Sequence, residues 1–209
     1  DDIILSETTD ALLNILETNT DLVLVYGLQR KVKNLNDINI FENFDKRNFT
    51  VIHNPIKKAM RNSMFNPSQF LARTELCKKV GGCDERIKFS QEYSLTLKLS
   101  ILGKFAKLNF PTAILPLVAP GQISEKKNNQ IYRVSKALEL FLEDNPELES
   151  KYKLYAQRRL TARAWRFAKR FKKSGFFSKW FLLYLKGFFY FNSNVLENCK
   201  KANEIYNDF

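Results

Sequence analysis

The sequence predicts an α/β domain followed by a helical extension. In the first part, an amphipathic stretch over residues 6–17 precedes a β-branched apolar run over residues 21–27, and two more strand-like runs lie between residues 105 and 118. From about residue 130 the pattern is helical. We therefore expect one domain over residues 1–125 and an extension over residues 126–209.

The net charge is concentrated in one segment. The chain of 209 residues is 44% hydrophobic, which is enough to bury a core, and its formal net charge is +12. Residues 151–190 contain twelve Lys and Arg and no Asp or Glu, so the rest of the chain is neutral overall. The basic character therefore belongs to the extension.

The first elements follow from residue spacing. Residues 6–17 form a helix whose core-facing side chains are Leu12, Ile15 and Leu16. The run over residues 21–27 is a buried strand. Residues 28–66 are polar and rich in Asn and Lys, and we expect a long loop with short strands that helps to shape a substrate site.

A glycine-rich turn separates two helices in the middle of the chain. Gly81-Gly82 ends a short helix over residues 74–80. A strongly apolar helix begins after Ser90, a residue type that caps helices, and ends at Gly103. Glu92 lies in the first turn of this helix. It either only complements the positive end of the helix dipole or is a carboxylate held by packing, which is a good place for a catalytic base.

The second half of the α/β part predicts two strands and a helix. The strands cover residues 105–110 and 112–118, and the spacing of Pro111 and Pro116 favours an edge position for the second strand, because proline cannot donate to a sheet. A helix over residues 131–143 follows and is broken at Asp144-Asn145-Pro146.

The extension combines cations with aromatic rings. One face of its first helix carries Leu160, Ala164, Phe167 and Phe171, and a parallel basic stripe carries Arg159, Arg163, Arg166, Arg170 and Lys173. After a break at Ser174-Gly175, residues 176–191 form a more apolar helix that is shorter than the roughly 20 residues needed to span a bilayer.

Three interpretations of this extension stay open. In the helix over residues 176–191, Lys179 and Lys186 lie on one edge and aromatic rings cover the rest. This arrangement suits a helix lying in the lipid headgroup region, and this is the interpretation that we favour. The helices could instead pack against the α/β domain. Nucleic-acid binding through arginine and stacked rings is the least favoured of the three.

The cysteines indicate a compartment and no cofactor. Cys77, Cys83 and Cys199 are odd in number and lack the spacing of a metal site, so neither a disulfide framework nor a zinc site is expected and a reducing cytoplasm fits. His53 is the single histidine, so we expect it to have a structural role or to face solvent.

The order of motifs in residues 70–104 resembles a known enzyme family. The segments are Phe70-Leu71-Ala72-Arg73, Thr74-Glu75-Leu76, Gly81-Gly82-Cys83-Asp84-Glu85, Gln91-Glu92-Tyr93-Ser94-Leu95, Lys98-Leu99 and Gly103-Lys104. This order is similar to the acceptor-side half of family 2 glycosyltransferases, which have the GT-A fold. Asp1-Asp2-Ile3 resembles the tail of the family's Asp-x-Asp-Asp motif, and residues 119–124 resemble a loop that closes the acceptor site in some members.

The resemblance implies a fold, a reaction and a set of site residues. The expected fold is a partial GT-A-like mixed sheet, and the expected reaction is an inverting transfer of a sugar from a nucleotide-sugar donor to a hydroxyl of a glycan or lipid-linked acceptor. Glu92 would be the base, in place of the family's aspartate. Asp1 and Asp2 would hold Mg²⁺ or Mn²⁺. The residues expected to bind substrate are Arg73, Asp84, Glu85, Gln91 and Gln122.

Departures from the family pattern limit these expectations. Cys83 replaces an aromatic residue in the glycine turn, and the chain begins without the units that bind the nucleotide in this family, so residues 1–209 alone are expected to be inactive. Arg73 faces a phosphate or pairs with an acid, and Asp84 forms a pocket wall or an ordinary turn.

The expected partners and location combine this resemblance with the basic aromatic extension and the cysteine content. They are the donor, the acceptor and an anionic membrane surface, at the cytoplasmic inner face of the membrane, with nucleic acid disfavoured. The alternative is a non-catalytic module whose basic aromatic tail binds membrane or nucleic acid.

Overall fold

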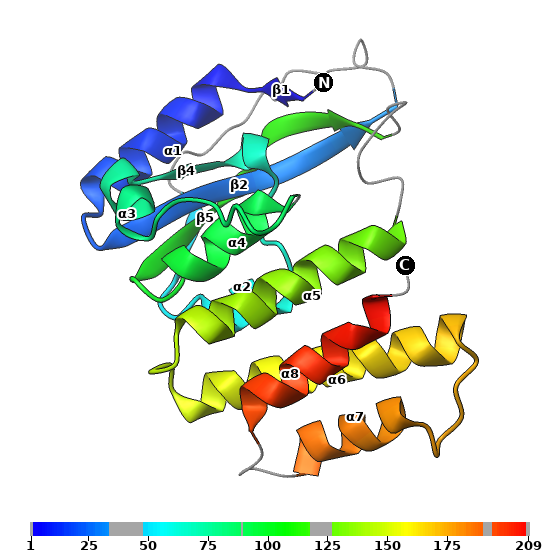
Figure 1. The fold of residues 1–209 in the computed structure, drawn as a ribbon. Coiled ribbons are helices and arrows are strands. Elements are labelled where there is room, and N and C mark those ends of the chain that lie inside the picture. The colour runs from blue at the N-terminus through cyan, green and yellow to red at the C-terminus, as the bar shows by residue number, and fades with distance from the viewer. Residues whose placement is uncertain (1, 34–47, 89, 118–126, 190–193, 208–209) are drawn as a thin grey trace. The chain divides into compact units, whose positions relative to one another are not determined.

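The computed structural model describes residues 2–33, 48–88, 90–117, 127–189 and 194–207, and it confirms an α/β protein with a mixed sheet (Figure 1). The chain divides into two compact units, Asp1–Asp84 with Leu95–Glu125, and Glu85–Ser94 with Lys126–Phe209. The strands are β1 (Ile3–Ile4), β2 (Leu22–Val32), β3 (Phe49–Ile52), β4 (Phe70–Ala72) and β5 (Lys104–Pro116). The helices are α1 (Ser6–Thr18), α2 (Ile56–Arg61), α3 (Thr74–Lys79), α4 (Gln91–Leu99), α5 (Lys127–Asp144), α6 (Ser150–Phe171), α7 (Lys179–Phe189) and α8 (Val195–Asn203), with short 3₁₀ turns at Pro67–Gln69 and Glu204–Tyr206.

The sheet of the first unit is organised around β2 and β5. Its order is β1-β5-β2-β4, and β3 pairs with another part of β5. The β2 and β5 strands are parallel, whereas β1, β3 and β4 each run antiparallel to the strand they pair with. Parallel neighbours need covered faces, and helices of this unit supply the cover.

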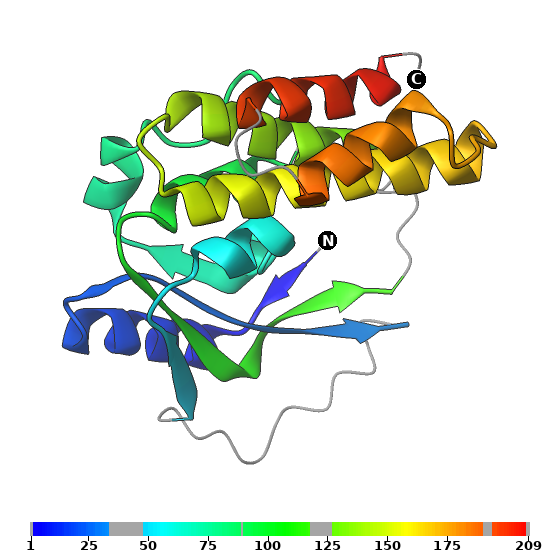
Figure 2. The same cartoon turned by 90° about the horizontal axis from the view of Figure 1, so that it is seen from below.

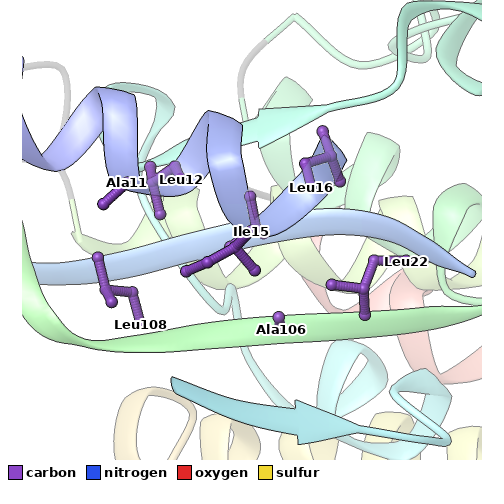
Figure 3. Close-up of a cluster of buried hydrophobic side chains, with 8 residues drawn as sticks. Ala11, Leu12, Ile15, Leu16, Leu22, Ala106 and Leu108 are labelled. Atoms are coloured by element: carbon purple, nitrogen blue, oxygen red, sulfur yellow. The ribbon is translucent and has the colours of Figure 1, made fainter. Parts of the chain in front are cut away.

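Helix α1 covers one face of this sheet, as its residue spacing predicts. Ala11, Leu12, Ile15 and Leu16 are buried with Leu22 and Val25 of β2 and Ala106 and Leu108 of β5 (Figure 3). Leu95 and Leu99 of α4 belong to a second buried cluster that includes Val23 and Phe105. The predicted helix at residues 6–17 and the predicted strand at residues 21–27 are both confirmed.

The prediction of an edge strand after Pro111 is wrong. Residues 104–116 form the single strand β5, which has neighbours on both sides. Pro111 lies opposite Leu28, where the β2–β5 register is irregular, and Pro116 is the last residue of the strand. A bulge leaves one residue outside the regular ladder, so a proline there costs no hydrogen bond.

The polar region after residue 27 contains strand segments, as predicted, and also a helix that was not predicted. β2 continues to Val32, and β3 and α2 follow within residues 49–61. Part of the predicted loop, residues 34–47, lies outside the described residues.

The second unit is built around α6, which runs beside α7 and α8 (Figure 1 and Figure 2). Of the four residues on the predicted apolar face, Leu160, Ala164 and Phe167 are buried, whereas Phe171 at the end of the helix is exposed. The helix predicted over residues 176–191 begins later, at Lys179, because Phe176 and Phe177 form a turn. No helix in the described part of the chain combines the length and apolarity needed to cross a membrane.

A glycine lets α7 approach α6 closely. A Cβ on Gly187 would lie 2.5 Å from Thr161 Oγ1, nearer than real Cβ atoms come to a neighbour. Gln157 of α6 donates to the carbonyl oxygen of Gly187 at 3.2 Å and accepts from Nδ2 of Asn198 in α8 at 3.1 Å. One buried amide therefore joins three helices.

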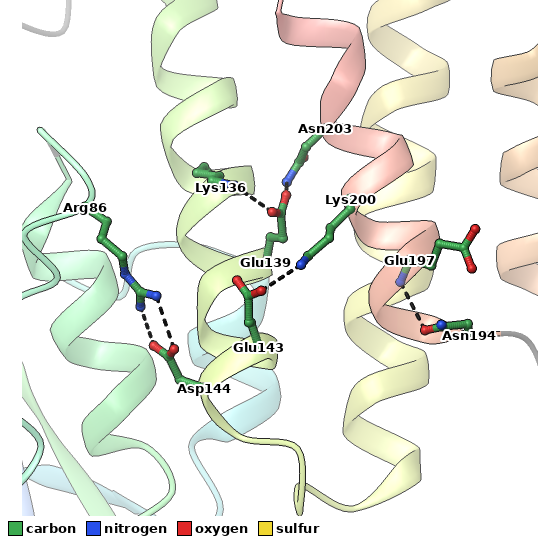
Figure 4. A network of polar contacts seen from close by, with 9 residues as sticks. All are labelled: Arg86, Lys136, Glu139, Glu143, Asp144, Asn194, Glu197, Lys200 and Asn203. Atoms are coloured by element: carbon green, nitrogen blue, oxygen red, sulfur yellow. Dashed lines mark hydrogen bonds and ion pairs between the residues drawn. The ribbon is translucent and has the colours of Figure 1, made fainter.

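A polar network joins α5 to α8. Glu139 is 3% exposed, and its carboxylate accepts from Nδ2 of Asn203 and Nζ of Lys136, each at 2.6 Å (Figure 4). Asn203 also donates to the carbonyl oxygen of Ser135 at 3.1 Å. A buried charge needs such partners, because its desolvation would otherwise destabilise the fold.

None of the three cysteines is joined in a disulfide, and the three differ in exposure. Cys83 is exposed, Cys77 is half-buried and Cys199 is buried, and burial raises the pKa of both Cys77 and Cys199. Since the thiolate is the reactive form, we expect Ellman's reagent to modify Cys83 first and Cys199 only on unfolding. Cys83→Ser should remove the fast phase; a fast phase that survives this substitution would contradict the assigned exposures.

Candidate functional site

The turn after α3 adopts the left-handed backbone that the paired glycines permit. Gly81 and Gly82 have φ angles of 69° and 64°, and their amides donate to the carbonyl oxygens of Lys78 and Cys77, each at 2.9 Å. A Cβ on either glycine would meet nothing within 4 Å, so backbone conformation, not lack of space, requires glycine here.

The same turn is tied to α4 by Lys98. Its Nζ atom donates to the carbonyl oxygen of Gly82 at 3.1 Å. Asp84, two residues further on, is 6% exposed, whereas Glu85 is exposed. The sequence motif indicates neither the Lys98 contact nor the difference between the two acids, because both depend on tertiary packing.

Ser90 marks the beginning of α4. It has a φ of 65°, and its carbonyl oxygen accepts from the amides of Tyr93 at 3.1 Å and Ser94 at 3.3 Å. Gln91 is exposed, and its Nε2 atom donates to the carbonyl oxygen of Lys88 at 2.7 Å. The helix begins where the sequence predicts, and Glu92 lies in its first turn.

Glu92 is half-buried, and burial raises the pKa of its carboxyl group. The positive end of a helix favours a carboxylate, so desolvation outweighs that effect here. A carboxyl group with a raised pKa is a stronger proton acceptor once ionised. Glu92 therefore has the local environment expected of a general base.

Tyr93, the next residue, is fully buried against basic side chains of α6. Its hydroxyl forms a hydrogen bond with Arg163, yet burial raises its pKa to about 12. Burial, and then the charge of Arg163, lower the pKa of Arg159. The predicted basic stripe is therefore divided: Arg159 and Arg163 are half-buried next to the first turn of α4, whereas Arg166 and Arg170 are exposed.

A second contact holds the segment before α4 within the same unit. Arg86 forms a two-pronged ion pair with Asp144 at the end of α5 (Figure 4). Together with Tyr93, this pair anchors residues 85–94, the segment that contains Glu85, Gln91 and Glu92.

Arg73 makes structural contacts. Its guanidinium donates to the carbonyl oxygens of Leu22 at 2.8 Å, Leu16 at 2.5 Å and Asn19 at 3.2 Å. Carbonyl oxygens at the end of α1 and the beginning of β2 thus take the donors that the sequence assigned to a phosphate or an acid.

The expected metal ligands are described only in part. Asp2 is exposed and accepts from Ser68 Oγ at 2.7 Å, whereas Asp1 lies outside the described residues, as does Gln122. A carboxylate is a suitable donor for Mg²⁺ or Mn²⁺. The described part of the chain contains no group of three or more His, Cys, Asp or Glu side chains arranged to hold a metal.

Comparison with known proteins adds no assignment. The chain matches no family model and has no significant match among curated proteins. The fold defines the chain as an α/β protein with a mixed sheet.

Proposed function

We propose that residues 1–125 form the acceptor-side part of an inverting family 2 glycosyltransferase with a GT-A-like fold. The observation that carries this proposal is Glu92, a half-buried carboxyl group with a raised pKa in the first turn of α4. The order of motifs around it supports the same reading. So do the left-handed glycine turn and the mixed sheet built on the parallel pair β2 and β5.

The proposed reaction needs a base because a sugar hydroxyl is a poor nucleophile near neutral pH. Glu92 would take the hydroxyl proton while the hydroxyl oxygen bonds to the anomeric carbon and the nucleoside diphosphate leaves from the opposite side. The resemblance assigns the binding of the acceptor to Asp84, Glu85, Gln91 and Gln122. Arg73 is left out of the proposed site because its donors are bound to carbonyl oxygens.

The leaving diphosphate develops negative charge. Asp1 and Asp2 would hold Mg²⁺ or Mn²⁺, which would stabilise that charge.

The test is sugar transfer by the product of the complete open reading frame. Donors with UDP, GDP and dTDP are supplied with Mn²⁺, and nucleotide release and product formation are measured with and without a chelator. We expect metal-dependent turnover with one class of donor. A folded protein that turns over no donor would favour the alternative, a non-catalytic binding module.

A further inference from the structure

Apolar side chains are exposed on one edge of the second unit. Of the five large hydrophobic residues in the described part of the chain that are more than half exposed, four lie within residues 176–189. They are Phe176 at 62%, Phe177 at 98%, Leu182 at 52% and Phe189 at 65%. Phe176 is braced by Phe181, with ring centroids 5.2 Å apart, so the turn that presents Phe177 is packed on one side.

The exposed residues of α7 form a stripe with two lysines. Lys179, Leu182, Lys186 and Phe189 are exposed and follow the spacing of one helical face. Trp180 and Gly187, on the other side of α7, are buried. We call this stripe together with Phe176 and Phe177 the aromatic edge.

A groove lies beside the aromatic edge. Its volume is about 370 Å³, and it is lined by Lys179, Trp180, Leu182, Leu183, Lys186, Lys201 and Glu204. Apolar side chains and three lysine ammonium groups share this surface with one carboxylate, that of Glu204. The surface is therefore complementary to an amphiphile with an anionic head. Lys201 of α8 forms an ion pair with Glu197. The other two lysines that line the groove, Lys179 and Lys186, belong to α7.

Charge complementarity identifies the occupant. No acidic residue occurs within residues 151–190, and Lys169, Arg170, Lys172 and Lys173 are exposed just before the aromatic edge. Such a surface is attracted to anionic lipid. An aliphatic side chain such as Leu182 partitions into lipid but offers no ring for a base to stack on, which favours a membrane over nucleic acid.

We propose that the aromatic edge docks on an anionic phospholipid bilayer, with Phe177, Leu182 and Phe189 entering the interface and Lys179 and Lys186 at the lipid phosphates. The protein is then peripheral, with α7 parallel to the membrane plane. This inference goes beyond the proposed function and does not depend on it, because transfer activity and vesicle binding are measured separately.

The test is sedimentation of the whole chain with vesicles of phosphatidylcholine, with and without phosphatidylglycerol. Wild type should bind only the anionic vesicles, and added salt should weaken binding. Phe177→Ser with Leu182→Ser should lower the partition coefficient by about tenfold or more, since each removes buried apolar area. Lys179→Glu with Lys186→Glu should lower it by a similar factor, of order ten.

Matched substitutions elsewhere are the controls. Leu13→Ser changes an exposed leucine on α1, and Lys57→Glu with Lys58→Glu reverses two exposed charges on α2; both should bind like wild type. Circular dichroism checks that every variant is folded. The proposal would be overturned if the aromatic-edge variants bound anionic vesicles as well as wild type does. It would also be overturned if wild type bound neutral and anionic vesicles equally. A third contradicting result would be that wild type binds a single-stranded oligonucleotide more tightly than vesicles and that substitution of Phe177 weakens this binding.

Discussion

Glu92→Gln should lower sugar transfer by about 10²–10⁴-fold, the usual contribution of a positioned general base. The amide keeps the shape of the side chain but cannot accept the hydroxyl proton, so kcat should fall while affinity for the nucleotide sugar stays the same. Initial rates and donor binding of the complete protein measure the two effects.

Two substitutions separate catalysis from simple charge removal. Glu92→Asp restores the residue that the resembled family uses and should keep part of the turnover. Glu75→Gln removes another first-turn glutamate, which is exposed on α3 and should not matter. Equal turnover in wild type and Glu92→Gln would reject Glu92 as the base.

The stability of Glu92→Gln distinguishes a base from a glutamate that only complements the helix dipole. Burial raises the pKa of Glu92, so the carboxylate destabilises the folded state above the ordinary glutamate pKa. Glutamine should therefore leave the free energy of unfolding at neutral pH unchanged or higher, with the difference vanishing below that pKa. A pure dipole role would instead lose about 0.3–1 kcal/mol on substitution.

Asn203→Leu should lower the free energy of unfolding by about 3 kcal/mol. This is the upper end of the cost of leaving a buried polar group without a hydrogen bond, and it applies because the acceptor, the carboxylate of Glu139, is charged. Glu139 would lose one of its donors while remaining 3% exposed, and the carbonyl oxygen of Ser135 would lose another. Urea denaturation followed by circular dichroism measures the loss.

A double substitution shows whether the loss comes from the buried carboxylate. Glu139→Leu with Asn203→Leu removes both polar partners, and the pair should be more stable than the sum of the single losses predicts. Lys200→Ala breaks the exposed ion pair with Glu143 across the same two helices and should have a much smaller effect. Additive losses in the double variant would contradict the assigned coupling.

Local patterns predicted the elements well where burial follows one face. Leu12, Ile15 and Leu16 have helical spacing and are buried, and the glycines after α3 adopt the predicted conformation. The position of β5 was not predictable from Pro111, because whether a proline occupies an edge or a bulge depends on the register of a partner strand far away in sequence.

The candidate site was predictable only in its local part. Glu92 lies in the first turn of a helix, as its sequence context indicates. The role of Arg73 depends on carbonyl oxygens more than fifty residues away, and Asn203 is sixty-four residues from Glu139. Residue types alone do not reveal such pairings. In the sequence, an arginine that binds phosphate cannot be distinguished from one that, like Arg73, donates to carbonyl oxygens at the end of a helix.

The close contact at Gly187 also fixes the rotational setting of α7. Because a side chain at this position would strike Thr161, only one rotation of α7 about its axis brings the bare backbone against α6. Lys179, Leu182, Lys186 and Phe189 are then left facing outward. The direction in which the surface stripe points is thus set by Gly187, which is buried. Substitutions in the stripe itself should therefore leave the rotation of α7 unchanged.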